Sequence, residues 1–489
     1  MGSKKPPGAG SGEQTPGGFA GRLCAAGHKR AAVKTENGEG GRGVELPWQI
    51  GEILGSLRAA GYQAYAVGGC VRDMLRGAAP HDWDLCTSAL PGEVERLFLG
   101  RFAAAHTGAA HGTLTLAAEG LPVEVTTFRA DGPYTDHRRP ASVRLGASLA
   151  EDLARRDFTI NAMALGPEGE VIDLFGGRRD LSAGLVRCVG NPEDRFAEDA
   201  LRILRALRFA AALDFAMEPA TLAAARAQKG ALRFVAAERV AAELDRLFAG
   251  PGAGRVLAGC GDILAVALPE IADVLCAPPC PALAGRTPWE FVAETIGAAA
   301  PVPQVRWALL LGGLGRKKEG AAGEQGPAPE GESRAERAGA GAEQALRRLK
   351  VKRSFGTQAA ALVRCCCMPL PTDETGVRRF LAHWGLATAL WRMEAERARL
   401  AALAGGPGAR CRRQGLERFE ELVKEQLAAG ACLGPADLAV KGKELLEAGL
   451  YRPGPEMGRA LKELLEQVLE GALPNEKTAL LAWAAEHKK

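Results

Sequence analysis

Hydrophobic and polar residues alternate in two different ways along this chain of 489 residues. Over residues 47–177, short apolar runs between helical stretches predict strands at 64–67, 84–86, 114–116 and 123–127. From Pro192 onward, Ala, Leu, Arg and Glu recur at helical spacing and strand signals nearly vanish. The pattern therefore predicts an α/β domain followed by an all-helical region.

Two stretches lack a periodic pattern. Residues 1–46 are dense in Gly, Pro, Lys and Glu and hold no apolar run of signal-peptide length, which predicts a disordered extension. Residues 317–342 repeat Gly, Glu, Ala and Pro, which predicts a solvated linker inside the helical part. No internal repeat is present, so a solenoid is not expected.

Composition narrows the class of protein without naming a partner. Hydrophobic residues make up 47% of the chain, as in ordinary globular proteins, and a net charge of +4 is too small to indicate a polyanionic ligand. No apolar run approaches the length of a membrane span, so we expect no membrane association and a cytoplasmic location. The 12 cysteines lack the paired spacing of metal ligands, which favours reduced thiols.

A pair of glycines follows the first predicted strand. Gly68 and Gly69 precede a helix start, a geometry that lets backbone N–H groups approach phosphate oxygens. Arg72, one helical turn further, would then contact a phosphate. Taken alone, such a Gly-Gly turn is more often a tight strand-to-helix connection, and it does not match the dinucleotide G-x-G-x-x-G pattern.

Acidic residues form a second candidate constellation. Asp82 and Asp84 flank Trp83, so on a strand their side chains point to the same face. Converging carboxylates are costly unless hydrated or neutralised, and Mg²⁺ is their natural counter-ion, the alternative being a solvated strand end. Glu124 lies in an otherwise apolar strand, where we expect it to be buried. There it would complete a catalytic three-carboxylate cluster or, alternatively, pair with Arg129.

Arg156 and Asp157 stand at the edge of an apolar stretch that should be core. An Arg that binds phosphate beside an Asp that accepts from a ribose hydroxyl suits a ribonucleotide site. The alternative is a salt bridge that caps a helix.

The segment 198–209 is strongly helical by composition. At ~100° per residue, Asp199, Arg202 and Arg205 share an arc opposite the apolar residues. Cytosine and adenine both present an amine donor beside a ring-nitrogen acceptor, whereas uracil and guanine present the reverse. Asp199 and Arg202 would therefore select C and A without a template, while Arg205 and Arg208 hold the triphosphate. The alternative is a solvated charged face.

These segments, in this order and spacing, resemble the class II tRNA nucleotidyltransferase and bacterial poly(A) polymerase family, most clearly over residues 60–250. The resemblance implies a polymerase beta-like α/β nucleotidyltransferase head at 47–177. It further implies all-α neck, body and tail domains at 178–250, 251–345 and 346–489.

The resemblance also implies roles for individual residues. Asp82 and Asp84 would bind the catalytic Mg²⁺. The residues that contact the incoming nucleotide would be Gly69, Arg72, Arg156, Asp157, Asp199, Arg202, Arg205 and Arg208. The implied reaction is attack of the tRNA 3′-hydroxyl on CTP or ATP with release of pyrophosphate, which adds C, C and A. Poly(A) polymerases and enzymes that add only the A or only the two C residues share these motifs and stay open as alternatives.

Other segments bear on the partner. Residues 131–140 resemble the family loop that helps the switch from C to A, and three C-terminal motifs resemble a tRNA-type tail, at 441–446, 453–458 and 473–476. Basic clusters that would line a path for tRNA phosphates lie at 347–353, 378–379 and 410–413. We expect a monomer or a homodimer.

The body departs from many members of the family. Where these carry the His and Asp ligands of a metal-dependent phosphohydrolase, this chain has Phe291, Gly312 and Gly313. The resemblance therefore implies a degenerate region without a second hydrolase activity.

Overall fold

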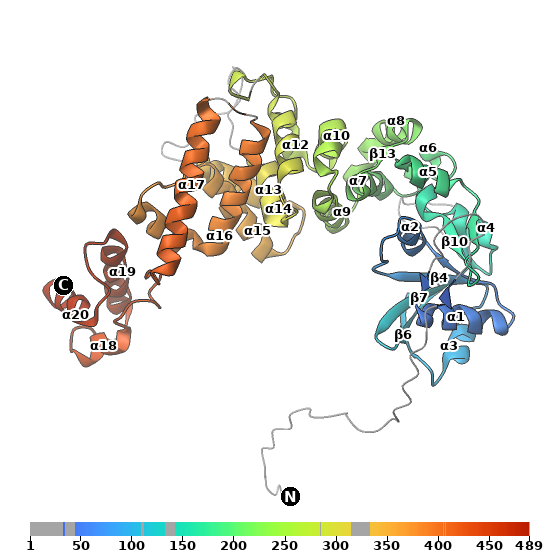
Figure 1. Cartoon of the computed structure of the whole chain (residues 1–489), viewed down its shortest axis with the longest axis horizontal. Helices are drawn as coiled ribbons and strands as arrows, with labels where there is room; N and C mark the ends of the chain where they lie inside the picture. The colour runs from blue at the N-terminus through green and yellow to red at the C-terminus, as the bar shows by residue number, and fades with distance from the viewer. Residues whose placement is uncertain are drawn as a thin grey trace, which may run out of the picture.

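The computed structural model describes residues 33–34, 45–108, 112–132, 142–283, 285–313, 333–403, 405 and 407–488. The elements follow chain order along an elongated molecule, with the α/β head at one end and the C-terminal helices at the other (Figure 1). The loop predicted at 131–140 lies mostly outside the described residues.

A mixed sheet of seven strands forms the head. Its order is β11 (Val171–Asp173), β10 (Met163–Leu165), β3 (Ala64–Val67), β4 (Trp83–Thr87), β7 (Leu121–Thr127), β6 (Thr113–Ala118) and β5 (Ala103–Gly108). Strands β4 and β7 are parallel, and the other neighbouring pairs are antiparallel. The four strands expected from the sequence are all present. The pattern misses β5, β10 and β11, which are short or rich in alanine, a weak strand former.

Helices α1 (Trp48–Ala59), α2 (Gly69–Leu75) and α3 (Pro91–Phe98) contribute to the core on one side of this sheet. In α1 the buried residues recur at the spacing of one helical face, namely Ile50, Ile53, Leu54 and Leu57. Alternation along the central strands sends Leu85 and Val125 into the same core. It therefore turns Asp84 and Glu124 to the opposite side of the sheet.

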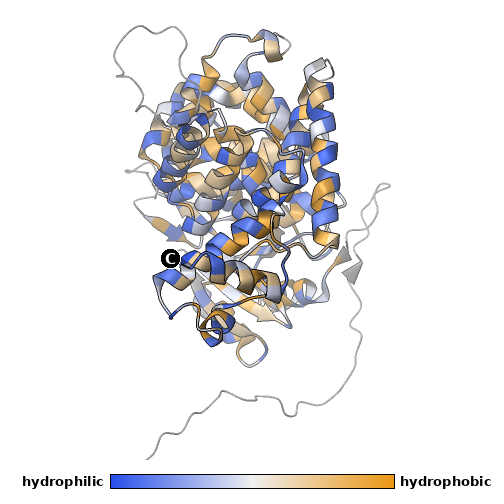
Figure 2. Cartoon of the chain, turned by 90° about the vertical axis from the view of Figure 1, so that its left-hand side faces the viewer, coloured by the Kyte–Doolittle hydropathy of each residue, from blue (hydrophilic) through white to orange (hydrophobic). Residues whose placement is uncertain are grey.

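Helices dominate the rest of the chain. They include α6 (Pro192–Glu198), α7 (Leu201–Leu213), α9 (Ala237–Ala249), α10 (Ala253–Ala267), α12 (Pro288–Ala298), α13 (Pro303–Leu311), α14 (Arg334–Arg348), α15 (Arg353–Cys366), α16 (Glu374–Ala402), α17 (Pro407–Ala428), α19 (Pro455–Glu470) and α20 (Lys477–Glu486). One buried hydrophobic cluster extends from Phe158 in the head to Ala398 in α16. Figure 2 shows hydrophobic and hydrophilic residues interleaved along these helices, as amphipathic packing requires. The predicted helical region is confirmed.

Two predictions of unstructured chain are wrong at their ends. Helix α14 begins at Arg334, inside the predicted linker 317–342, because Ser333 and Glu336 form a capping box and Ala338 packs in the core. Within the predicted extension 1–46, the pair β1 (Val33–Lys34) and β2 (Glu45–Leu46) forms an antiparallel bridge. The remaining parts of both stretches lie outside the described residues.

None of the described helices combines the length and the hydropathy that a membrane span requires.

Candidate functional site

Three acidic residues lie near the start of β4 and on the neighbouring strand β7. Asp84 of β4 is in register with Glu124 of β7, and Asp82 comes directly before β4. Burial raises the pKa of Asp84, and the negative charges of Glu124 and Asp82 raise it further, while the guanidinium of Arg156 opposes them. The three carboxylates thus share one region of the sheet.

The prediction that Glu124 is buried is wrong, because its side chain is exposed, as is that of Asp82, whereas Asp84 is half-buried. The alternative partner of Glu124 is otherwise occupied, since Arg129 pairs with Asp131 at 3.8 Å. Among the described residues, no three His, Cys, Asp or Glu side chains converge closely enough to hold a metal ion. The like charges of these carboxylates repel one another, and their exposure lets water solvate Asp82 and Glu124 at separate positions.

The glycine turn lets the end of β3 approach this acidic region. Gly68 has a φ of +81°, a left-handed conformation that favours glycine. A Cβ at this position would lie 3.1 Å from Nη1 of Arg156 and 3.7 Å from Oδ2 of Asp84. A Cβ on Gly69 would lie 3.5 Å from Nη2 of Arg72. Both predicted phosphate-binding arginines therefore border the two glycines.

Arg156 is held by an acid that the sequence analysis did not single out. Asp152, fully buried in α4 (Leu149–Ala154), pairs with Arg155 at 2.7 Å and with Arg156 at 3.1 Å. Burial tends to raise the pKa of Asp152, but the two guanidiniums outweigh it and lower that pKa. The alternative of a local salt bridge is thus realised for Arg156, which also lies beside Asp84.

Asp157 serves as a junction between the head and the neck. Its Oδ2 accepts from Nε and Nη2 of Arg205 at 2.8 and 2.6 Å, and its Oδ1 accepts from the amide of Phe158 and from Nδ2 of Asn161. Burial opposes ionisation, but the charge of Arg205 outweighs it and lowers the pKa of Asp157. Since a carboxylate has about four acceptor positions, a ribose hydroxyl would have to displace one of these donors.

Asn161 links this junction to the glycine turn. Its Oδ1 accepts from Nη1 of Arg72 at 2.7 Å, while its Nδ2 donates to Asp157. The Arg72 guanidinium lies 5.4 Å from the ring centroid of Phe209 in α7, and that of Arg208 lies 4.1 Å from the same centroid. The predicted phosphate-binding residues of head and neck therefore meet around one aromatic ring.

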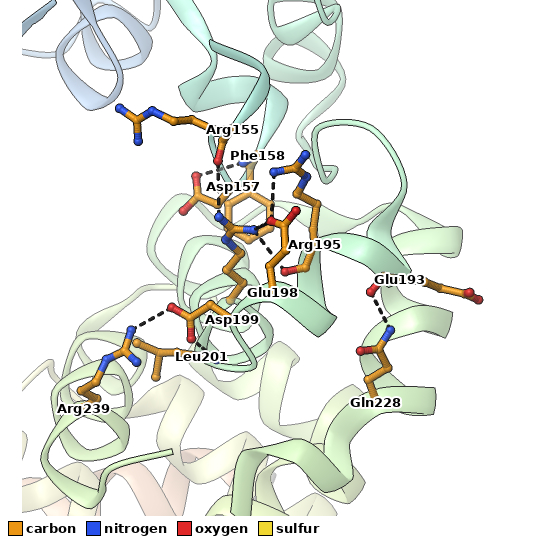
Figure 3. A network of polar contacts seen from close by, with 11 residues as sticks. Arg155, Asp157, Phe158, Glu193, Arg195, Glu198, Asp199, Leu201, Gln228 and Arg239 are labelled. Atoms are coloured by element: carbon orange, nitrogen blue, oxygen red, sulfur yellow. Dashed lines mark hydrogen bonds and ion pairs between the residues drawn. The ribbon is translucent and has the colours of Figure 1, made fainter. Parts of the chain in front are cut away.

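The helix predicted over 198–209 is interrupted. Asp199 has an extended backbone between α6 and α7, and its Oδ1 accepts from the amide of Leu201. Aspartate favours this capping geometry over a helix interior, which explains the break. Its Oδ2 accepts from Nη2 of Arg239 in α9 at 2.8 Å, as Figure 3 shows.

Arg202 lies in the first turn of α7 and is held by contacts to the segment before it and to the head. Its Nη1 donates to Glu198 and to the carbonyl of Arg195, and its Nη2 donates to the carbonyl of Arg155 at 3.3 Å. Arg202 thus pairs with Glu198, whereas Asp199 pairs with Arg239. Arg202 and Asp199 are neighbours in the chain but are held separately.

Arg205 and Arg208 both face Glu243 of α9, at 3.9 and 3.0 Å. Burial lowers the pKa of Arg208 to about 10 although Glu243 opposes the shift, so the guanidinium stays charged at neutral pH. The predicted triphosphate-binding pair is therefore half-buried, and both guanidiniums already contact acids of the protein.

The basic clusters of the helical region are partly used to join helices. Arg348 pairs with Glu270 at 2.7 Å, Lys350 with Glu238 at 2.8 Å, and Arg379 with Glu470. These pairs are surface ion pairs, which contribute little to stability and leave the guanidiniums accessible.

The mixed sheet with paired acids, joined to a helical neck that supplies arginines, defines a nucleotidyltransferase of the polymerase-head class. Residues 64–187 match the family model described as poly A polymerase head domain. Residues 214–274 match the model described as probable RNA and SrmB-binding site of polymerase A, and residues 338–484 match a putative second domain of tRNA nucleotidyltransferases.

Similar proteins cover most of the chain. The CCA-adding enzyme of Geobacillus thermodenitrificans is 36% identical over 439 residues, which covers 89% of this chain and 96% of that protein. The CCA-adding enzyme of Levilactobacillus brevis is 35% identical over 440 residues, 88% and 95% of the two chains. The crystal structure of the Bacillus stearothermophilus CCA-adding enzyme in complex with CTP superposes with a TM-score of 0.65 at 31% identity, covering 90% and 96%. The chain belongs to the family of CCA-adding enzymes, which are nucleotidyltransferases that use a divalent metal ion.

Proposed function

We propose that this protein adds C, C and A to the 3′ end of tRNA, using CTP and ATP and releasing pyrophosphate. The observation that carries the proposal is similarity to CCA-adding enzymes over most of the chain, together with the position of Asp84 beside Arg156. A cytoplasmic location and a monomeric or homodimeric state belong to the same proposal.

Asp82 and Asp84 would hold Mg²⁺, with Glu124 as a neighbouring catalytic carboxylate. The raised pKa of Asp84 supports this assignment, because a carboxylate crowded by like charges gains most from a nearby cation. Carboxylate oxygens are also the ligands that Mg²⁺ prefers. When bound, the ion would lower the pKa of the attacking hydroxyl and offset charge on the phosphates.

The incoming triphosphate would bind between head and neck. Gly69 would let the chain approach a phosphate closely, with the guanidinium of Arg72 beside it and that of Arg156 beside the preceding Gly68. On the neck side, Arg205 and Arg208 supply further positive charge. Asp157, whose acceptor positions are occupied, would act on the ribose only after one of its donors moves, and in the present arrangement it holds Arg205 in place.

Asp199 and Arg202 would read the base. An acceptor carboxylate beside a donor guanidinium complements the edge that cytosine and adenine share, and it opposes the edges of uracil and guanine. Arg239 and Glu198 fix these two side chains before a nucleotide arrives. A pre-oriented pair loses less entropy on binding, which favours discrimination without a template.

The domain roles complete the proposal. Residues 47–177 would catalyse, 178–250 would select the base, and the helical segments 251–345 and 346–489 would bind the tRNA body. The degenerate region around Phe291 would contribute no hydrolase chemistry.

The decisive experiment is incubation of the protein and Mg²⁺ with tRNA that lacks its last three nucleotides. CTP alone should give two added residues, and CTP with ATP should give three. A lone A added to tRNA ending in CC, two C residues without A, or a long A tract on any RNA would each replace the proposal with the corresponding specialised relative.

A further inference from the structure

A cavity of about 1050 Å³ lies within the helical body, apart from the acids of β4. Helices α12, α13, α15, α16 and α17 all contribute to its lining, and part of that lining is apolar, including Leu283, Phe291, Val292 and Leu309. This volume is that of a typical small-molecule site. Phe291, Gly312 and Gly313 are all part of the wall.

The lining of this body cavity also carries a cluster of charges centred on Glu396. The Glu396 carboxylate pairs with Arg392 at 2.6 Å, with Arg412 at 2.8 Å and with Arg399 at 3.7 Å. Burial opposes ionisation of this carboxyl group, but Arg392 and its neighbours outweigh burial and lower the pKa of Glu396. Three guanidiniums therefore share one carboxylate.

Positive charge is in excess on this wall. Arg334 also lines the cavity, and Glu396 is the one acidic residue among the described residues of the lining. Arg392 has a side chain only 3% exposed, and its Nε is buried without a hydrogen-bond partner. A buried guanidinium that lacks a full set of acceptors is costly, so negative charge brought near it by a ligand on the neighbouring Arg399 and Arg412 would be favourable.

Access to the cluster differs among the three arginines. The Arg412 side chain is 47% exposed, whereas that of Arg399 is 15% exposed and lies 3.6 Å from the position of a Cβ on Gly312. The cluster thus runs from solvent at Arg412 to the interior at Arg392. An entering ligand would meet positive charge along its whole path.

We propose that the body cavity binds a phosphate-bearing ligand, with the phosphate on Arg399 and Arg412 and an attached apolar portion against Phe291 and Leu309. Guanidinium pairs suit phosphate because each presents a planar fork of donors. The phosphate would belong either to a free phosphorylated small molecule or to a nucleotide of bound tRNA. The inference does not depend on the proposed reaction, since no residue of the cavity lies in the catalytic region.

Phenyl phosphate, the simplest probe with both features, tests this by isothermal titration calorimetry on the full chain. Arg399→Gln and Arg412→Gln should each weaken binding about tenfold or more, because each removes a charge-assisted contact. Arg397→Gln is the matched control: it removes an arginine of the same helix that pairs with Glu420 at 2.7 Å and does not line the cavity.

Unchanged affinity in both cavity variants, an equal loss in the Arg397→Gln control, or no heat with the native chain would each overturn the proposal. Thermal melting of each variant shows that the fold is kept, and Arg412→Gln is the safer substitution because that side chain is half exposed. Repeating the titration with tRNA bound separates the two sources. Competition assigns the site to an RNA phosphate, and persistence assigns it to a free small molecule.

Discussion

Asp84 and Glu124 face each other in register across the parallel strands β4 and β7, on the side of the sheet opposite α1 and α3. Their mutual repulsion, added to burial, raises the pKa of Asp84. Such an arrangement opposes the stability of the head and persists where it serves chemistry. Experiments on Asp84 therefore separate its structural cost from its catalytic role.

Asp84→Asn should lower nucleotide incorporation at least about 100-fold while leaving tRNA affinity within about twofold, because the amide is a poor ligand for Mg²⁺. Single-turnover incorporation and filter binding measure the two quantities. The matched control is Glu95→Gln, which changes an exposed acid of α3 that pairs with His106. Full turnover in Asp84→Asn would remove this residue from the metal site.

In the absence of metal, Asp84→Asn should increase the stability of the protein although it lowers activity. A carboxyl group whose pKa is raised in the folded state destabilises that state once pH exceeds its ordinary pKa, and the penalty disappears as pH falls below it. We therefore expect metal-free Asp84→Asn to melt above the native protein at pH 7, with the difference vanishing near pH 3.5. Mg²⁺ should raise the melting temperature of the native protein more than that of the variant.

Gly68 offers a test of how closely β3 must approach the site. Gly68→Ala places a Cβ at a φ of +81° and 3.1 Å from Nη1 of Arg156, so it should cost about 1–2 kcal/mol of stability and displace that guanidinium. Activity should fall with it. Gly55→Ala in α1 is the control, because no atom lies within 4 Å of its Cβ position and alanine favours helices. Equal effects of the two substitutions would contradict the argument.

The sheet was predictable where its pattern is strong. The apolar pattern predicted the strand at 84–86, which β4 contains. The prediction that Asp82 shares a strand face with Asp84 is not met by the strand itself, because β4 begins only at Trp83. The exposure of Glu124 was not predictable from its own strand. It depends on which side of the sheet the helices cover, and that is a tertiary property.

The neck was predictable in its helical content but not in its pairing. Composition gives no sign that the helix ends at Asp199, because the break depends on a capping contact with the amide of Leu201. Asn161 was missed for a related reason: its partner Arg72 lies in another element. Asp152 is a different case, because its partners Arg155 and Arg156 follow it by three and four residues and that spacing was a signal in the sequence. Glu198 lies in the segment 198–209, four residues before Arg202, and this spacing indicates an ion pair between the two side chains.

The ion pair between Arg239 and Asp199 should determine how well the Asp199 carboxylate is oriented toward a base. Arg239→Gln removes the ion pair that orients the Asp199 carboxylate, while leaving Arg202 on Glu198. Selection of C and A over U should therefore weaken by about tenfold, the scale of one charge-assisted hydrogen bond, while incorporation of CTP falls less. Competition between CTP and UTP on tRNA lacking its terminus measures the ratio. Arg246→Gln, an exposed position on the same helix, should leave the ratio unchanged. If UTP stays fully excluded in Arg239→Gln, the Asp199 carboxylate does not depend on this pair to read the base.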